Sequence, residues 1–199
     1  ITTAEWAPGV WAGAENMPIE IRDNTLATSR GTSTVSSVSL IDRTVTLDAA
    51  IPAVVSGDVL FHKGAYGNEF PGIHKILTQT TGTLFNINCA TYNLFQGNSF
   101  SAASVALSFT KLNLAITRAV EKGLDGKVLT LVNPRAWANM LSDQAALRKY
   151  DSSYSPIKAE NGSKSLTFYS QNGEIEIEPS IYVKEGYAYM LSLDEWMRV

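Results

Sequence analysis

The sequence predicts an α+β fold in which a mixed sheet is flanked by helices. Three observations predict it: β-branched runs with turn signals in residues 35–103, helical spacing of apolar residues at 110–122, and further strand-like runs after residue 166. The change from strand spacing to helical spacing also predicts two domains. These are a β-rich half with an irregular N-terminal segment, residues 1–103, and an α/β half, residues 104–199.

Turn and strand signals alternate through the first half. Residues 1–34 are rich in Thr, Ser, Gly and Pro and alternate only at 19–21, so we expect them to be largely irregular. Strands are predicted at residues 44–47, 59–61 and 84–87, a glycine-rich loop at 63–72, and a short element of undefined type at 73–77.

The second half begins with helical signals. Thr110 is the expected N-cap of a helix whose inner face carries Leu112, Ile116 and Val120, and Gly123 is its expected end. A second helix should follow a buried strand at 128–132. It begins at Asn133-Pro134, with Asn as N-cap and Pro in the first helical position, and buries Trp137, Met140 and Leu141. Further strands are expected at residues 166–169, 174–178, 181–183 and 187–191.

Composition excludes several functional classes. The chain has 199 residues, a formal net charge of -3 and 45% hydrophobic residues. A protein that grips nucleic acid through a broad basic face is more basic, so we expect no sequence-specific nucleic-acid partner. The single cysteine, Cys89, cannot form an internal disulfide. No apolar run is long enough for a membrane span, so we expect no membrane partner.

The residues that could carry chemistry form no recognised catalytic motif. His62, Glu69 and His74 could supply a metal site, but their spacing matches no compact metal motif. Cys89 lacks the setting of a catalytic thiol and is expected to be buried. A serine nucleophile elbow, a phosphate-binding loop and a dinucleotide fingerprint are also missing from the sequence. We therefore predict no catalytic residue, cofactor or metal, and no enzyme.

Two groups of residues are candidates for a subunit interface. Glu174, Glu176 and Glu178, which we call the glutamate row, alternate with isoleucines, so their carboxylates project from one side of a strand about 7 Å apart. They either face solvent or meet a basic surface of another subunit. Trp6 and Trp11 flank a Pro-Gly turn, and we expect them to pack either on this chain or on a neighbour.

One stretch resembles a known family. The sequence VLTLVNPRAWANML at residues 128–141 is similar to the strand-Asn-Pro-x-x-Trp-helix segment in the axial domain of tailed-bacteriophage major capsid proteins of the Hong-Kong-97 type. The helix expected at 110–122 occupies the corresponding preceding position. Residues 43–48 and 56–68 resemble a hairpin and loop of such subunits, and residues 174–191 resemble later strands of the axial domain.

The resemblance covers about residues 40–199 and implies an axial domain with part of a peripheral domain. It implies a structural protein that assembles with copies of itself, as hexamers and pentamers, into an icosahedral shell enclosing phage DNA. Scaffold and portal proteins are the further implied partners. The implied location is the virion, after synthesis in the host cytoplasm.

This sequence departs from the family pattern at its start. The family has an N-terminal arm and a long spine helix, and no long helix is predicted before residue 104. The chain begins with Ile1 instead of Met, so we expect it to be a fragment of a longer product.

A β-rich module that binds a carbohydrate or a host surface is the alternative. Trp6, Trp11 and Tyr66, together with the polar loops, suggest it. Sugar binding needs aromatic side chains clustered in a cleft, whereas a shell subunit spreads them over its edges.

Overall fold

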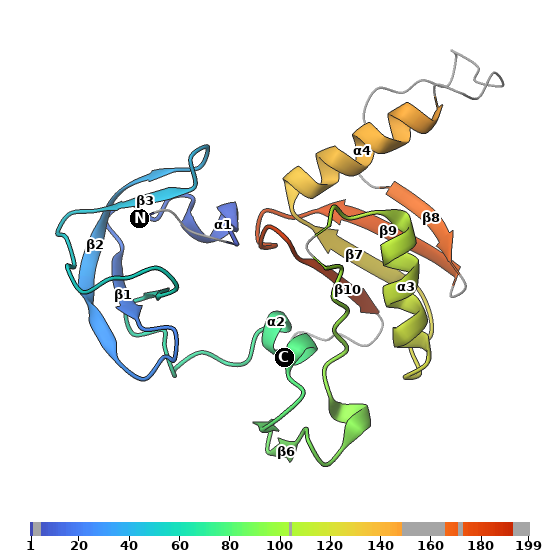
Figure 1. Cartoon of the computed structure of the whole chain (residues 1–199), viewed down its shortest axis with the longest axis horizontal. Helices are drawn as coiled ribbons and strands as arrows, with labels where there is room; N and C mark the ends of the chain where they lie inside the picture. The colour runs from blue at the N-terminus through green and yellow to red at the C-terminus, as the bar shows by residue number, and fades with distance from the viewer. Residues whose placement is uncertain (2–4, 104, 149–165, 171–172, 193–199) are drawn as a thin grey trace. The chain divides into compact units, whose positions relative to one another are not determined.

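The computed structural model describes residues 1, 5–103, 105–148, 166–170 and 173–192; for residues 143–148 and 166–169 it describes the backbone alone. It contains helices and both antiparallel and mixed sheets, so the α+β class is confirmed. The chain divides into two compact units, Ile1–Phe70 and Pro71–Val199. Figure 1 shows the elements of each unit, which we describe in turn.

The boundary between the units lies at Phe70/Pro71, whereas the sequence analysis placed it at 103/104. The difference arises because residues that follow Pro71 contact strands near the end of the chain. The imidazole Nδ1 of His74 lies 3.1 Å from the Tyr189 hydroxyl. Such a long-range contact leaves no trace in local composition.

The first unit is built on a four-stranded antiparallel sheet in the order β3-β2-β1-β4. Ile19 and Ile21 are fully buried on one face of β1, where they alternate with Glu20. Residues before 34 are more regular than expected, because the polar strand β2 is held by backbone pairing on both sides. The elements are α1 (Pro8–Trp11), β1 (Pro18–Arg22), β2 (Ser29–Ser39), β3 (Thr44–Leu47) and β4 (Val59–His62), which confirms the strands predicted at 44–47 and 59–61.

The turn between β1 and β2 is ordered by one carboxylate. Asp23 Oδ1 accepts hydrogen bonds from the Thr25 hydroxyl at 2.8 Å and from the Ala27 N–H at 3.0 Å. The hydrogen bond from Thr25 is the largest cause that lowers the pKa of Asp23 below its ordinary value of 3.8.

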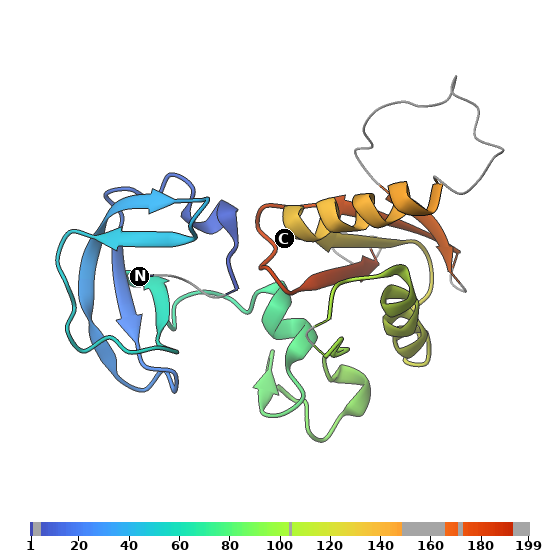
Figure 2. The ribbon, with the colours of Figure 1, turned by 45° about the horizontal axis from the view of Figure 1, so that its top comes forward.

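The second unit is built on a four-stranded sheet in the order β10-β7-β9-β8, in which β7 and β9 are parallel and the other pairs antiparallel. Figures 1 and 2 show α3 and α4 beside this sheet. Leu112 and Ile116 of α3 and Trp137 and Met140 of α4 share one core with the sheet residues Val128, Val132, Ile175 and Ile177. The elements are α2 (Ile73–Thr78), β5 (Thr83–Leu84), β6 (Ile87–Asn88), η1 (Asn93–Phe95), α3 (Phe109–Val120), β7 (Val128–Val132), α4 (Pro134–Arg148), β8 (Leu166–Ser170), β9 (Gly173–Pro179) and β10 (Ala188–Ser192).

Helix α3 has the predicted inner face and the predicted end. Gly123 has a φ of +96°, a conformation that favours glycine, and the Leu124 N–H donates to the Ala119 carbonyl. Its start differs from the prediction, because the N-cap position is Ser108 instead of Thr110. The Ser108 side chain makes no capping hydrogen bond, so local capping chemistry does not set this boundary.

The Asn133 side chain uses both of its ends to link the start of α4 to the turn at Val183. Its Oδ1 accepts from the Arg135 N–H at 3.0 Å, which is the predicted N-cap interaction. Its Nδ2 donates to the Val183 carbonyl at 2.9 Å, a contact that sequence reasoning could not foresee. Asn133 and Val183 are both 2% exposed, so the hydrogen bond between them is shielded from water.

Two predicted strands are wrong. Residues 84–87 form the turn and inner ends of a hairpin, β5–β6, because Phe85 and Asn86 have φ values of 49° and 65° that reverse the chain. Residues 181–183 form a turn that carries the Val183 carbonyl to Asn133. The strands predicted around 166–169, 174–178 and 187–191 are confirmed.

Candidate functional site

The glutamate row lies on the face of β9 that is turned away from α3 and α4. Ile175 and Ile177 point into the core and are 0% exposed, whereas Glu174 and Glu176 are exposed and Glu178 is half-buried. The alternation therefore follows from the two-residue repeat of a strand with one buried face. The glutamate row therefore points outward, as it must either to face solvent or to meet a basic surface of another subunit.

Leucines of the neighbouring strand flank the glutamate row. In the parallel register of β7 and β9, Leu129 lies beside Glu176 and Leu131 lies beside Glu178. Both leucines are half-buried. This face, which we call the open face of the sheet, thus places a line of carboxylates next to a line of partly exposed aliphatic side chains. Such a surface suits contact with a partner that offers both cations and apolar groups.

Trp6 and Trp11 do not lie at a surface. They are 2% and 8% exposed and belong to the core of the first unit. Their indoles are the largest side chains in that core, which packs them against Ile19, Ile21 and Val35. This burial corrects their assignment as interface residues, and it also removes them from the stacking platform that a carbohydrate-binding module would need.

Tyr66, the third aromatic residue considered for sugar binding, is engaged by its own chain. Its ring packs edge-on against Phe61, with centroids 5.3 Å apart. The Arg22 guanidinium lies over the same ring, 4.1 Å from its centroid. One partly exposed tyrosine held in this way does not make an aromatic cleft.

The two histidines considered for a metal site each pack against an aromatic ring of their own unit. His62 packs against Trp11 in the first unit, with ring centroids 5.5 Å apart, whereas His74 packs against Tyr187 in the second unit. Cys89 is fully buried, as expected. Within the part of the chain that the structure describes, no group of His, Cys, Asp and Glu side chains is arranged to hold a metal ion.

Sequence reasoning missed a second surface feature, the segment of residues 83–95, which we call the apolar hairpin segment. It contains β5, β6 and η1 and extends from the body of the second unit (Figures 1 and 2). Leu84 and Cys89 anchor it, while Phe85, Leu94 and Tyr92 are 60%, 81% and 62% exposed. The sequence signal that could have revealed it is a run of large apolar residues, among them Leu84, Phe85 and Ile87, interrupted by asparagines at 86, 88 and 93.

Among the described helices, none combines the length and apolar character needed to cross a membrane. No family model, curated protein sequence or solved structure matches this chain.

Proposed function

We propose that this chain is a structural protein, the major capsid subunit of a tailed bacteriophage or prophage, which self-assembles into an icosahedral shell around phage DNA. Its partners would be copies of itself in hexamers and pentamers, together with scaffold or portal proteins. Its location would be the virion, after synthesis in the host cytoplasm. The observation that carries the proposal is the apolar hairpin segment, a projecting element that presents large apolar side chains to solvent.

Burial of these side chains gives a reason for association. Covering one exposed Phe or Leu side chain contributes about 1.5–3 kcal/mol. A stable interface needs about 1,600 Å² in total, so a few such side chains support weak pairwise contacts. Closed rings multiply weak contacts, because each subunit repeats the same contact around the symmetry axis.

The segment formed by β7, Asn133 and α4 also supports the proposal. It has the strand, cap and helix order on which the capsid resemblance rests, and α3 packs in the same core. The open face of the sheet adds a charged surface with a fixed repeat. Like charges in a ring of subunits must be matched by cations or they repel, which restricts the arrangements that can close.

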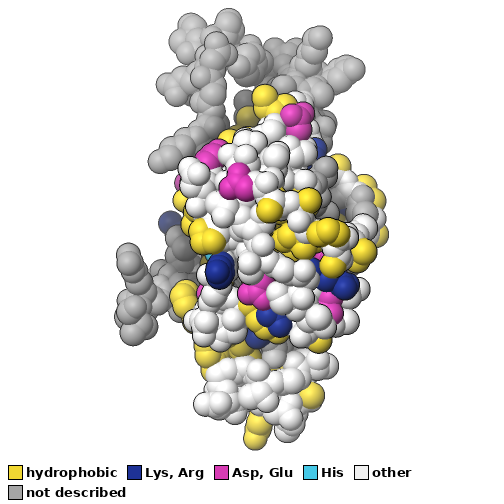
Figure 3. All heavy atoms as spheres, turned by 90° about the vertical axis from the view of Figure 1, so that its left-hand side faces the viewer, with side chains coloured by type: hydrophobic (Ala, Val, Ile, Leu, Met, Phe, Trp, Pro, Cys, Tyr) yellow, Lys and Arg dark blue, Asp and Glu magenta, His cyan; other side chains and the backbone are white. Residues whose placement is uncertain are grey.

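The surface charge is compatible with a shell that encloses DNA without gripping it. On the face drawn in Figure 3, Lys and Arg side chains lie in small separate groups, some of them next to Asp and Glu side chains. A net charge of -3 gives little long-range attraction for a polyanion.

The test is to express the complete reading frame that contains this chain and to examine the product by negative-stain electron microscopy and light scattering. Closed particles of uniform diameter are expected. The double variant Phe85→Ser/Leu94→Ser should reduce particle yield, while Leu114→Ser, which changes a leucine that is 52% exposed on α3, serves as the matched control for lost apolar surface. A product that stays monomeric at every concentration would overturn the proposal.

A further inference from the structure

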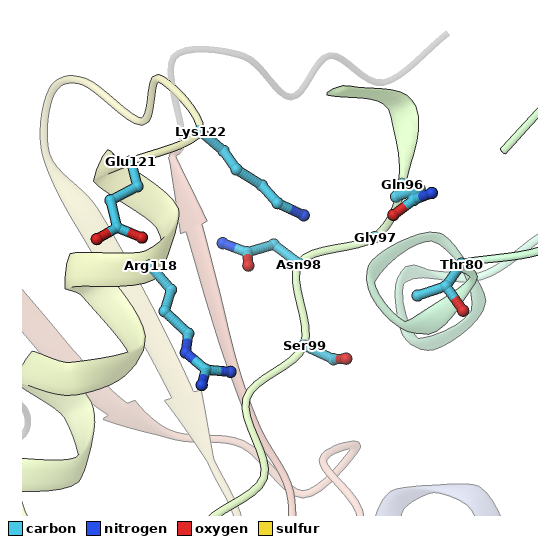
Figure 4. Close-up of a pocket in the computed structure, with 8 residues that line it drawn as sticks. All are labelled: Thr80, Gln96, Gly97, Asn98, Ser99, Arg118, Glu121 and Lys122. Carbon is cyan, nitrogen blue, oxygen red and sulfur yellow. The ribbon is translucent and has the colours of Figure 1, made fainter. Parts of the chain in front are cut away.

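The second unit contains a polar pocket of about 310 Å³ between helix α3 and the segment of residues 96–99. Arg118, in the last turn of α3, and Lys122, two residues after the end of α3 at Val120, line one side of the pocket. The other side presents groups that can donate hydrogen bonds, from Gln96, Asn98, Ser99 and Thr80. Figure 4 shows the Arg118 side chain reaching from α3, and the Lys122 side chain from the residues that follow α3, toward Asn98 and Ser99.

The donor groups of this pocket are not used elsewhere in the described part of the chain. No intramolecular hydrogen bond or ion pair is found there for the side chains of Gln96, Asn98, Ser99, Thr80 or Lys122. The one acidic lining residue, Glu121, is directed away from Asn98 in Figure 4. The pocket therefore combines two cations with four neutral polar side chains whose donors remain free for a ligand.

Both walls of the pocket are held in place. The Gly97 N–H donates to the Gln79 carbonyl at 2.8 Å, and a Cβ atom at Gly97 would lie 2.4 Å from the Leu77 carbonyl oxygen. Only glycine permits this close approach of the two backbones. On the other wall, the Arg118 guanidinium lies 5.1 Å from the centroid of the Phe100 ring, which limits its orientation. Such preorganised donors bind a ligand with less loss of side-chain entropy.

We propose that this pocket binds a phosphate-type oxyanion. The two cations exceed the single lining carboxylate, Glu121, by one positive charge and therefore favour an anion, and the placement of donors on two opposite walls selects its shape. A tetrahedral phosphate presents oxygen atoms in several directions and can accept from both walls, whereas the two oxygens of a planar carboxylate lie to one side. The phosphate can be free inorganic phosphate or a phosphate of a polynucleotide backbone, and the pocket recognises the same group in either case. This inference does not rest on the capsid proposal.

The test is a titration of the full chain, followed through its backbone amide resonances by nuclear magnetic resonance. The probes are inorganic phosphate, acetate and a short oligothymidylate. The pocket variant Arg118→Gln/Lys122→Met removes both cations. The control variant Lys75→Met/Lys127→Met makes the same change in net charge at two exposed lysines outside the lining.

Inorganic phosphate is expected to produce saturable shifts at Gly97, Asn98 and Lys122, and acetate is not. The pocket variant should bind phosphate at least about tenfold more weakly, because each lost cation removes a charge-assisted hydrogen bond, while the control variant should bind as the parent does. Tighter binding of oligothymidylate through the same resonances would identify a polynucleotide backbone as the source, and binding of inorganic phosphate alone would identify the free ion. The proposal is overturned if phosphate gives no saturable shift, if acetate binds equally well, or if both double variants lose the same affinity.

Discussion

Replacing Asn133 by Ala should destabilise the second unit by more than the loss of an ordinary helix cap. The cap itself contributes about 1 kcal/mol, through the hydrogen bond from the Arg135 N–H to Oδ1. The variant also leaves the Val183 carbonyl without the Nδ2 donor at 2.9 Å. Since Val183 is 2% exposed, that orphaned acceptor costs a further 1–3 kcal/mol, roughly. The expected total loss in the free energy of unfolding is about 2–4 kcal/mol.

The matched variant Asn133→Ser separates the two contributions. A serine hydroxyl can still accept from the Arg135 N–H, but it is too short to reach the Val183 carbonyl. We therefore expect this variant to lose about 1–3 kcal/mol, less than the alanine variant does.

The assay is urea unfolding followed by far-ultraviolet circular dichroism. The two longest described helices, α3 with 12 residues and α4 with 15, both belong to the second unit, so the helical signal reports on that unit. If Asn133→Ala unfolds within about 0.5 kcal/mol of the parent, the side chain is not the link between α4 and the turn at Val183, and our reading of this junction is incorrect.

Four further outcomes are expected. Trp137→Ala should lower the free energy of unfolding of the second unit by about 3–5 kcal/mol, because its indole is buried; a urea melt that matches the parent would place it at the surface. Gly97→Ala should cost about 1–3 kcal/mol in the same melt, since its Cβ would meet the rigid Leu77 carbonyl, and an unchanged melt would contradict that contact. Changing all three residues of the glutamate row to Gln should leave the melting temperature of the monomer unchanged and lower the yield of shells, more at low salt than at high salt. Equal light scattering by variant and parent would mean that the row is a solvent-exposed face with no role in assembly. In an NMR titration Asp23 should have a midpoint below 3.8, so that its contribution to stability is complete above that pH and is lost as the pH falls through the lowered value; a midpoint at 3.8 or above would contradict this.

The second unit was the more predictable from sequence, because its signals are local. The apolar run of β7 and the Asn133-Pro134 pair specify a buried strand and a helix start within a few residues. The alternation in β9 likewise predicted that the three glutamates project from one side of the strand. These elements needed no knowledge of distant contacts.

The errors arose where distant contacts or unusual backbone conformations decide the structure. The hairpin turns through positive φ values at Phe85 and Asn86, and such values are uncommon for a residue like Phe85, so the run looked like one strand. The turn at residues 181–183 is held by Asn133 from 50 positions away. Trp6 and Trp11 could have been surface or core residues from sequence alone, and only the packing of the first unit decides it.

The order of strands in the second sheet has a consequence during synthesis. Central strand β7 pairs with β9 and with β10, so Val128 has its partners at Ile175 and Ser192. A ribosome that adds about 5–20 residues per second makes β10 only after roughly 3–13 s, and through that interval the Val-Leu-Thr-Leu-Val strand stays incomplete. The pairing partners of β1, β2, β3 and β4 are all made within the first 62 residues, so the first sheet can close early. We therefore expect nascent chains halted after β7 to be bound by chaperones, and those extended past β10 to be released.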